Sequence, residues 1–279
     1  MPELPEVETV RRMLAANISG SRILRVDVFY DKIISTGQEA FVNAVSGQTI
    51  HAINRVGKYL VFVLDDVAFI SHLRMEGKYN LIAAEVDVPL TKHEHLVFHL
   101  ADGRELRYHD TRKFGRMMLT GKDDYRDRKP LSTLAPEPSE ATAEYLWLRV
   151  SNSRRPLKSL LLDQTVLAGI GNIYANEICL RARVDPRQIG NMLTEEICAR
   201  LLTAATTVLA EAVAAGGTTI SSFNSGGIDG LFQAQLLIYG QKTCQVCGGE
   251  VTRLTIGGRG TYFCHHCQAG EEEDEQKCQ

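Results

Sequence analysis

Hydrophobic and polar positions change their spacing twice along this chain. Between residues 2 and 16, Val7, Val10 and Leu14 recur at helical intervals behind a proline and several acids, which predicts a helix with one buried face. From about residue 22 to 120, short apolar runs bounded by Gly, Asp and Asn replace that pattern. No long helical pattern alternates with these runs, so we expect an antiparallel β-sandwich rather than a parallel α/β sheet. The clearest strand candidates are 23–30, 59–64, 68–72, 96–100 and 116–119.

The spacing becomes helical in the second half. Residues 127–139 combine three prolines with polar residues and predict a linker. Residues 218–231 predict an exposed loop. The expected architecture is therefore a β-rich part followed by a helical part. Two domains agree with the length of 279 residues at about 100–200 residues per domain. The predicted helices are 139–151, 157–163, 171–181 and 194–215, the last ending before two glycines.

Composition excludes several classes of protein. The charged share of 23% and the hydrophobic share of 44% exclude global disorder. We expect no signal peptide at the N-terminus, because it opens with prolines and acids, and no membrane span, because no apolar run approaches ~18 residues. A net charge of −3 counts against a generally polybasic nucleic-acid binder.

The charge is unevenly distributed, however. The last nine residues, EEEDEQKCQ, hold five acids and one lysine, so they contribute −4 and leave +1 for the rest of the chain. Segment 102–130 holds nine Lys or Arg against six acids. Affinity for DNA depends on where cations face phosphates, so the sum over the chain does not exclude it. We expect residues 270–279 to be a disordered acidic tail.

Four of the seven cysteines form two Cys-x2-Cys pairs, separated by sixteen residues. Clustering of this kind indicates metal ligation in a reducing compartment rather than a disulfide framework. The intervening sequence alternates and contains glycines at 257, 258 and 260, which predicts a hairpin with Arg259 at its tip. Four thiolates complete a tetrahedral site, so we expect one structural Zn2+ without a position for catalytic water. The predicted ligands are Cys244, Cys247, Cys264 and Cys267.

The N-terminus offers a nucleophile. Removal of Met1 would expose Pro2 as a secondary amine with a pKa near the α-amino range of about 7.7–8.0, so part of it would be neutral at pH 7. Such an amine can attack an aldehydic sugar carbon and form an iminium that promotes elimination. Glu3 and Glu6 lie beside it as a general acid or a binding group. The same residues would also suit an ordinary helix N-terminus.

Six segments occur in one order: MPELPEVETVRR, RVGKYL, SHLRMEGKY, RYHDTRKFG, LAGIGNIYANE and the four-cysteine ribbon. Together they resemble bacterial formamidopyrimidine-DNA glycosylases, which remove 8-oxoguanine and ring-opened purines from DNA. The resemblance extends from residue 1 to about 268. It implies an α+β, bilobal fold with an N-terminal helix and β-sandwich. It also implies a C-terminal helix-two-turn-helix domain that includes the zinc-ribbon hairpin.

The resemblance implies a catalytic role for four residues. Pro2 would attack C1′ of the damaged nucleotide and form a Schiff base, and Glu3 would supply a proton for ring opening or base departure. Lys58 would serve β-elimination and contact phosphate. Arg259 would contact phosphate and support δ-elimination. Glu6 is expected to bind substrate.

Further positions are expected to contact DNA. An extruded nucleotide leaves a hole in the base stack, and Met75, Arg112 and Phe114 match the family's side chains that fill it. Without the resemblance, Met75 and Phe114 would be taken for core residues, although charged neighbours favour exposed loops. Asn172 follows a Gly-rich turn and could hold a phosphate or only cap a helix. The remaining candidates are His72, His93, Arg154 and Lys158.

The resulting organisation has five segments. They are a catalytic domain at 1–126, a linker at 127–139, a helix-two-turn-helix domain at 140–232, a zinc ribbon at 233–269 and the tail at 270–279. The partner is expected to be damaged double-stranded DNA, with no membrane, for a monomer in the bacterial cytoplasm associated with the nucleoid. Two alternatives stay open: an endonuclease VIII-type glycosylase for oxidised pyrimidines, and a non-catalytic zinc-ribbon DNA-binding protein.

Overall fold

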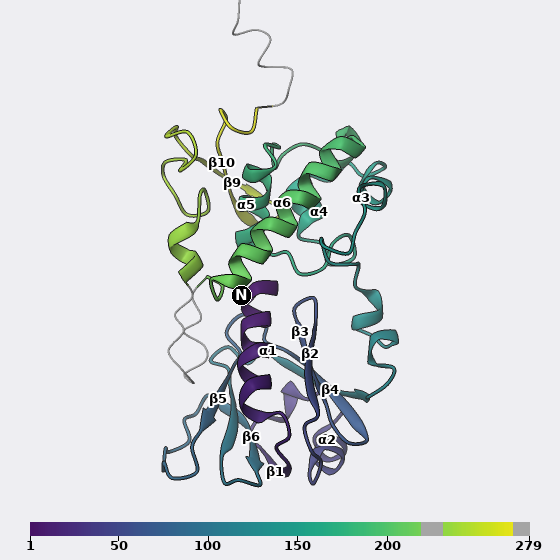
Figure 1. Ribbon diagram of the computed structural model, residues 1–279, viewed down its shortest axis with the longest axis vertical. Helices are drawn as coiled ribbons and strands as arrows, with labels where there is room; N and C mark the ends of the chain where they lie inside the picture. Colours follow the sequence, from purple (N-terminus) through teal and green to yellow (C-terminus); the bar gives the residue numbers. More distant parts are fainter. Residues whose placement is uncertain (219–230, 270–279) are drawn as a thin grey trace, which may run out of the picture. The chain divides into compact units, whose positions relative to one another are not determined.

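The computed structural model describes residues 1–218 and 231–269, which form two compact units (Figure 1). The first unit comprises residues 1–132 and 216–218, and the second comprises 133–215 and 231–269 of the described chain. Most of the predicted loop at 218–231 lies outside the described residues, as do the acidic tail and Cys278.

The first unit is a β-sandwich with helices beside it. One antiparallel sheet has the order β1-β6-β7-β5 and the other has the order β2-β3-β4-β8. Helix α1, purple in Figure 1, packs against β2 and β3. This arrangement confirms the prediction of an N-terminal helix followed by a sandwich. The bounds are α1 Leu4–Ile18, β1 Ile23–Val28, α2 Gln38–Val45, β2 Ala52–Val56, β3 Tyr59–Val63, β4 Val67–His72, β5 Lys78–Ile82, β6 Glu94–Leu100, β7 Glu105–His109 and β8 Arg116–Gly121, with short 3-10 turns at Asp31–Ile33, Tyr125–Asp127 and Leu131–Thr133.

Aromatic side chains join the two sheets. The rings of Phe62 in β3 and Phe69 in β4 are stacked at 4.4 Å, and Phe69 stacks on Phe98 of β6 in the other sheet at 5.6 Å. Phe41 of α2 meets both Phe69 and Phe98 edge to face. All four are buried, and such pairs stabilise a core by about 0.5–1.5 kcal/mol beyond the area they bury.

Several short elements were not singled out from the sequence. Helix α2 has eight residues and buries only Phe41 and Val45, so its apolar stripe is too short to show helical periodicity. Strands β2, β5 and β7 have five residues each and contain Arg or Lys within their span. Pairing with neighbouring strands, rather than their own composition, makes them strands.

Two loops lead from one sheet to the other at the same edges of the sandwich. Residues 73–77 join β4 to β5, and residues 110–115 join β7 to β8. Because β4 pairs with β8 in one sheet and β5 pairs with β7 in the other, the two loops begin and end on neighbouring strands. The fold therefore places the segments RMEG and DTRKFG side by side.

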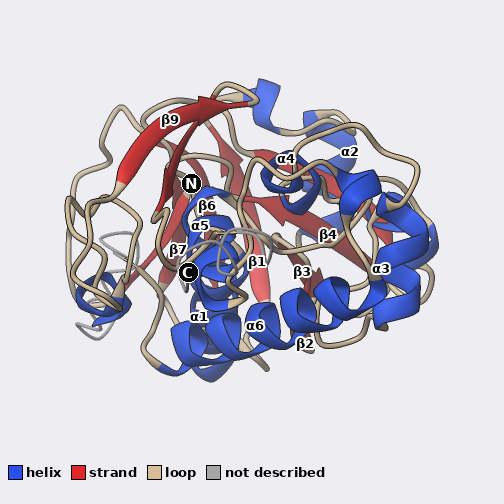
Figure 2. Cartoon of the chain, turned by 90° about the horizontal axis from the view of Figure 1, so that it is seen from above, coloured by secondary structure: helices blue, strands red, loops and turns tan. Residues whose placement is uncertain are grey.

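The second unit is helical and ends in a two-stranded hairpin (Figure 1). Helices α3 and α5 both pack against the long helix α6, which Figure 2 labels. The predicted helices are all present within a few residues of their expected bounds. The bounds are α3 Ala143–Val150, α4 Leu157–Leu161, α5 Asn172–Arg181, α6 Glu195–Ala214, β9 Thr252–Ile256 and β10 Arg259–Phe263, with 3-10 turns at Gly190–Met192 and Leu231–Gln235.

Within the described residues, α6 alone is long and apolar enough to cross a membrane by length and composition, with a mean hydropathy of 1.5. The expectation that no segment approaches such a span was wrong for this helix. Its hydropathy comes from many Ala and Leu residues, and 44% of its apolar window is buried inside the unit. A core helix passes the same test, so the finding is weak evidence for a membrane.

Candidate active site, DNA-contact loops and zinc centre

The N-terminal acids form a capping box at the start of α1. Pro2 precedes the helix, and Glu3 is its N-cap. The Glu6 Oε2 atom accepts the backbone N–H of Glu3 at 2.8 Å, and the Glu3 carboxylate accepts the backbone N–H of Glu6. Glu3 is only 2% exposed. The reciprocal bonds fix the residue next to Pro2 in one conformation.

Glu6 has a second set of partners in the same unit. Its Oε1 atom accepts the backbone N–H of Thr218 at 2.9 Å and the Thr218 hydroxyl at 3.1 Å. A Cβ at Gly217, whose φ is +81°, would lie 2.8 Å from the same oxygen, so only glycine fits there. Glu6 therefore joins the N-terminal helix to Thr218, the last described residue before position 219. Its predicted role in binding substrate is not visible in these contacts.

Lys58 and His72 occupy adjacent positions of the second sheet. Lys58 lies in the two-residue turn between β2 and β3 and is 5% exposed. His72 ends β4, where its ring meets Tyr59 edge to face at 4.5 Å. Its Nδ1 accepts the backbone N–H of Arg74 at 2.9 Å, so the neutral ring has its proton on Nε2. Burial first, and then the charges of Arg74 and Lys58, lower the pKa of His72 to about 3.

The two sheet-to-sheet loops contain the three predicted stack-filling residues. Phe114 is 47% exposed, Arg112 is exposed and Met75 is half-buried, so none of them is a core residue. The Arg112 guanidinium lies 4.8 Å from the centre of the Phe114 ring. The Thr111 hydroxyl donates to Glu76 and links the two loops. The structure thus brings together an apolar side chain, a ring and a guanidinium on one edge.

Asp110 and Tyr108 shape this edge, although neither was singled out from the sequence. Asp110 is fully buried and accepts the backbone N–H of Arg112 at 2.9 Å and of Gly115 at 2.8 Å. A Cβ at Gly115 would lie 1.7 Å from the Tyr108 hydroxyl, and one at Gly77 would lie 2.3 Å from it. An aspartate before a polar turn often accepts backbone N–H groups of the residues that follow it. The sequence His109–Asp110–Thr111 could therefore have indicated the role of Asp110.

His93 lies at the base of the same edge. It is half-buried, its backbone carbonyl accepts the N–H of Asp110 at 2.9 Å, and its ring lies 5.6 Å from that of His109. His93 Nδ1 has no hydrogen-bond partner among the described residues. The ring therefore retains an unused polar atom beside the exposed loops.

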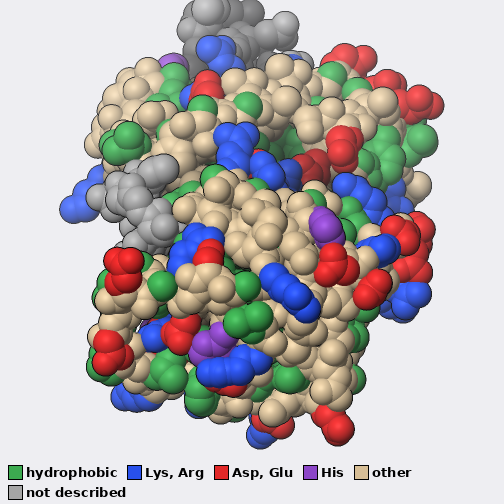
Figure 3. All heavy atoms as spheres, turned by 60° about the horizontal axis from the view of Figure 1, so that its bottom comes forward, with side chains coloured by type: hydrophobic (Ala, Val, Ile, Leu, Met, Phe, Trp, Pro, Cys, Tyr) green, Lys and Arg blue, Asp and Glu red, His purple; other side chains and the backbone are tan. Residues whose placement is uncertain are grey.

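The excess of cations in segment 102–130 is only partly available to a ligand. Arg104, Arg107 and Arg128 form ion pairs with neighbouring acids at 2.6 Å. Lys113 and Arg116 are exposed around the Phe114 loop. On the face drawn in Figure 3, Lys and Arg side chains lie among Asp and Glu side chains. Arg126 and Lys129 are also exposed, so cations of this segment lie at the surface both at the loop and beyond it.

The four cysteine sulfurs fit one zinc ion. They lie within 4.8 Å of one another, with Sγ–Sγ distances of 3.9 Å for Cys244–Cys267 and 3.5 Å for Cys247–Cys264. A tetrahedron with Zn–S bonds of about 2.3 Å has edges of about 3.8 Å. The cluster brings together all four predicted ligands, which is consistent with one structural zinc ion, and neither neighbouring histidine belongs to it.

Arg259 is the first residue of β10, directly after the Gly257–Gly258 turn, and is exposed at the tip of the hairpin. Lys158 is fully buried, and its Nζ donates to the Gly260 carbonyl and to Asn176 Oδ1, both at 2.9 Å. The Asn172 side-chain amide donates to the same Gly260 carbonyl at 3.3 Å. Lys158 and Asn172 thus hold the residue that follows Arg259.

Helix α5 also fixes both ends of the ribbon. Asn176 Oδ1 accepts the backbone N–H of Tyr262 at 2.8 Å. The buried Glu177 carboxylate accepts three successive N–H groups, from 237 to 239, at 2.8–3.0 Å. Burial raises the pKa of Glu177 despite these bonds. The sequence analysis interpreted NIYANE only as a helix start and missed the roles of Asn176 and Glu177.

Arg154 lies in the exposed loop between α3 and α4.

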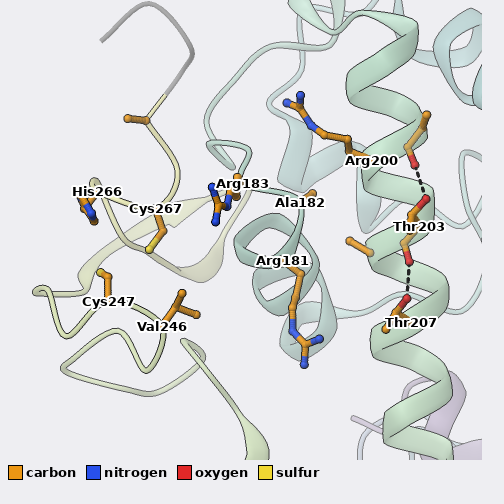
Figure 4. Close-up of a pocket in the computed structure, with 13 residues that line it drawn as sticks. Arg181, Ala182, Arg183, Arg200, Thr203, Thr207, Val246, Cys247, His266 and Cys267 are labelled. Carbon is orange, nitrogen blue, oxygen red and sulfur yellow. Dashed lines mark hydrogen bonds between the residues drawn. The ribbon is translucent and has the colours of Figure 1, made fainter. Parts of the chain in front are cut away.

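A hollow of about 880 Å³ lies between α5, α6 and the ribbon (Figure 4). Arg181, Arg183 and Arg200 line it, together with the zinc ligands Cys247 and Cys267. The threonines at its wall donate their hydroxyls to α6 carbonyls, as the dashed lines show. No predicted catalytic or DNA-contact residue lines this hollow.

These features define a protein with a β-sandwich, a helical unit that ends in a four-cysteine ribbon, and a proline at position 2. The chain matches the formamidopyrimidine-DNA glycosylase N-terminal domain over residues 1–117 and the H2TH domain of the same enzymes over 134–224. Residues 241–270 match the zinc finger found in FPG and IleRS. The chain belongs to the formamidopyrimidine-DNA glycosylase family.

Named relatives resemble the chain over nearly its whole length. The formamidopyrimidine-DNA glycosylase of Bacillus licheniformis is 47% identical over 275 residues, which are 96% of this chain and 99% of that protein. The Bacillus subtilis enzyme is 44% identical with the same coverage. A Lactococcus lactis Fpg in complex with DNA that contains an abasic site superposes with a TM-score of 0.90 at 38% identity, over 96% of this chain and all of that one.

Proposed function

We propose that this protein is a bifunctional base-excision-repair enzyme that removes 8-oxoguanine and formamidopyrimidines from duplex DNA and then cleaves the strand at the abasic site. Family membership over the whole chain is the observation that supports this most strongly. A second solved structure supports the lesion class, because it contains a Lactococcus lactis Fpg variant with Fapy-dG-containing DNA and has a TM-score of 0.89. Damaged duplex DNA is accordingly the proposed partner.

The proposed chemistry begins at the N-terminus. After removal of Met1, the Pro2 nitrogen attacks C1′, the damaged base leaves and the C1′–O4′ bond of the sugar ring opens. The proton of the amine and a proton that Glu3 supplies go to the departing base and to O4′, and an iminium remains at C1′. In β-elimination, C2′ loses a proton and the 3′ phosphate leaves, and Lys58 assists this step. A second, δ-elimination expels the 5′ phosphate with support from Arg259. The strand is left with a gap and phosphate ends.

The proposed DNA contacts fall into direct and indirect groups. Met75, Arg112 and Phe114 would fill the stack, since they lie on neighbouring loops where Arg112 and Phe114 are exposed and Met75 is half-buried. Arg154 would contact phosphate directly. For Lys158, burial and the bonds to the ribbon favour an indirect role that positions Arg259. For Asn172, its bond to Gly260 favours the same role. The neutral His72 would act only as an uncharged hydrogen-bonding group or as a structural residue. For the half-buried His93, a hydrogen bond from its ring to DNA and a structural role are both proposed.

We further propose the domain division given above, a monomer as the working unit, and a location in the bacterial cytoplasm with the nucleoid. No membrane is among the proposed partners.

The test is a comparison of lesions in otherwise identical duplexes. Purified enzyme should cleave strands with 8-oxoguanine or formamidopyrimidine opposite cytosine and leave undamaged DNA intact. Thymine glycol should be cleaved at least tenfold more slowly, because the purine-specific loop residues are present. Preference for thymine glycol would favour the endonuclease VIII-type alternative. Binding without cleavage by a protein with a free Pro2, checked by mass spectrometry, would favour the non-catalytic alternative.

A further inference from the structure

Two segments of the first unit provide the groups that the proposed chemistry uses first. Pro2 and Glu3 lie at the start of α1, and Lys58 lies in the turn between β2 and β3. Helix α1 packs on both strands, so the position of Lys58 relative to the helix depends on the contacts that hold the turn in place. Among the described contacts, those of Glu8 and Arg55 connect the helix to the turn.

Arg55 connects the helix to the turn in two steps. Its Nε donates to Glu8 Oε2 at 3.1 Å, and its Nη1 donates to the Gly57 carbonyl at 2.9 Å. Gly57 has a φ of +56° and directly precedes Lys58. The side chains of Glu8 and Arg55 are only 13% and 15% exposed. A partly buried, two-point contact of this kind is more geometrically restrictive than a surface ion pair.

Glu8 is well suited to anchor this contact. Its carboxylate also accepts Arg11 Nε at 2.9 Å and Arg12 Nε at 2.8 Å. Burial alone would raise the pKa of Glu8, but the hydrogen bonds from the arginines outweigh it and lower the pKa to about 2. Glu8 therefore stays ionised at every pH at which the enzyme would act.

We propose that Glu8 and Arg55 are positioning residues, which hold the Lys58 turn in a fixed place relative to the N-terminal helix. This inference rests on the proposed function, because it concerns the alignment of Lys58 with the sugar that Pro2 attacks. Arginine is required because its planar fork reaches a carboxylate and a carbonyl at once, whereas a lysine ammonium is a single point charge. Neither residue needs to contact DNA.

The experiment measures single-turnover trapping with borohydride on a duplex that contains an abasic site, with affinity for a non-reactive abasic analogue measured in parallel. Arg55→Met and Glu8→Gln should each slow trapping by about tenfold, since small misplacements of catalytic groups cost this much or more. Their affinities should stay within about twofold of wild type. Arg55→Lys keeps the charge and should stay slow.

Arg12→Met is the matched control. Arg12 shares the Glu8 carboxylate, but its side chain is 58% exposed and has no described bond to the turn, so this variant should trap at the wild-type rate. Melting temperatures of all variants identify any loss of folding, and Arg55→Lys and Glu8→Gln remain decisive if Arg55→Met does not fold.

Three results would overturn the inference: wild-type trapping by Arg55→Met or Glu8→Gln, full rescue by Arg55→Lys, or equal loss in Arg12→Met. Absence of an adduct with wild-type protein is a different result. It would refute the proposed function first and this inference with it.

Discussion

The buried ammonium of Lys158 allows a prediction about two neighbouring substitutions. Its Nζ donates to Asn176 Oδ1 and to the Gly260 carbonyl. In Lys158→Met, both acceptors keep another donor, because Tyr262 N–H bonds Asn176 Oδ1 and the Asn172 amide bonds Gly260. In Asn176→Ala, the charge stays buried and loses a described partner.

The two substitutions should therefore differ in cost. Lys158→Met loses two charge-assisted hydrogen bonds of about 1.5–3 kcal/mol each, offset by the desolvation of the ammonium, so we expect a net loss near 2 kcal/mol. Leaving a buried group without a hydrogen-bond partner costs about 1–3 kcal/mol, and more for a charged group. Asn176→Ala does this twice, since it also removes the acceptor of the Tyr262 N–H. Asn176→Ala should thus destabilise more than Lys158→Met, and the double variant should cost less than the sum of the two.

The single tryptophan makes this measurable. Trp147 lies in α3 of the second unit, so its fluorescence during urea unfolding of zinc-loaded protein reports on that unit. In parallel, cleavage of abasic-site DNA reports on the position of Arg259. Equal or reversed costs for the two variants would refute the reasoning, as would strictly additive losses.

Three further predictions concern pH, zinc and loop packing. Since the pKa of His72 is lowered to about 3 from an unfolded value near 6.5, its stabilising contribution is full above pH 6.5 and is lost as pH falls. When the pH is lowered from 7.5 to 5.5, the free energy of unfolding of His72→Gln, measured with urea, should therefore fall by about 1.4 kcal/mol less than that of wild type. Chelation of zinc should expose the β9 and β10 amides to hydrogen exchange while β3 and β4 stay protected, because the ribbon depends on its metal. Gly115→Ala should lower stability by about 1–3 kcal/mol through the clash with Tyr108, and Tyr108→Phe should recover part of the loss in thermal melts.

Much of the fold was predictable because its signals are local. The helical spacing in α5 and α6, the alternation in the ribbon and the cysteine spacing depend on residues close in sequence. Short elements such as α2 and β7 were missed because pairing and packing with distant residues define them.

The candidate site divides in the same way. Cys244 and its partners were predictable from spacing, and the exposed Phe114 loop from its charged neighbours. The burial of Lys158 was not predictable, because its acceptors lie 18 and 102 residues away in the chain. The Arg55 bond to Glu8 likewise spans 47 residues. From the sequence alone, Lys158 resembles a phosphate contact. Only its hydrogen bonds in the structure show that its ammonium is buried.

The most direct test of the central claim is to trap and map the covalent intermediate. Protein with Met1 removed is incubated with borohydride and a duplex that contains 8-oxoguanine opposite cytosine, and the adduct is digested and located by mass spectrometry. The account predicts one adduct, attached through the nitrogen of Pro2, that is absent when Met1 is retained. An adduct on a lysine, or none with processed protein, would contradict it.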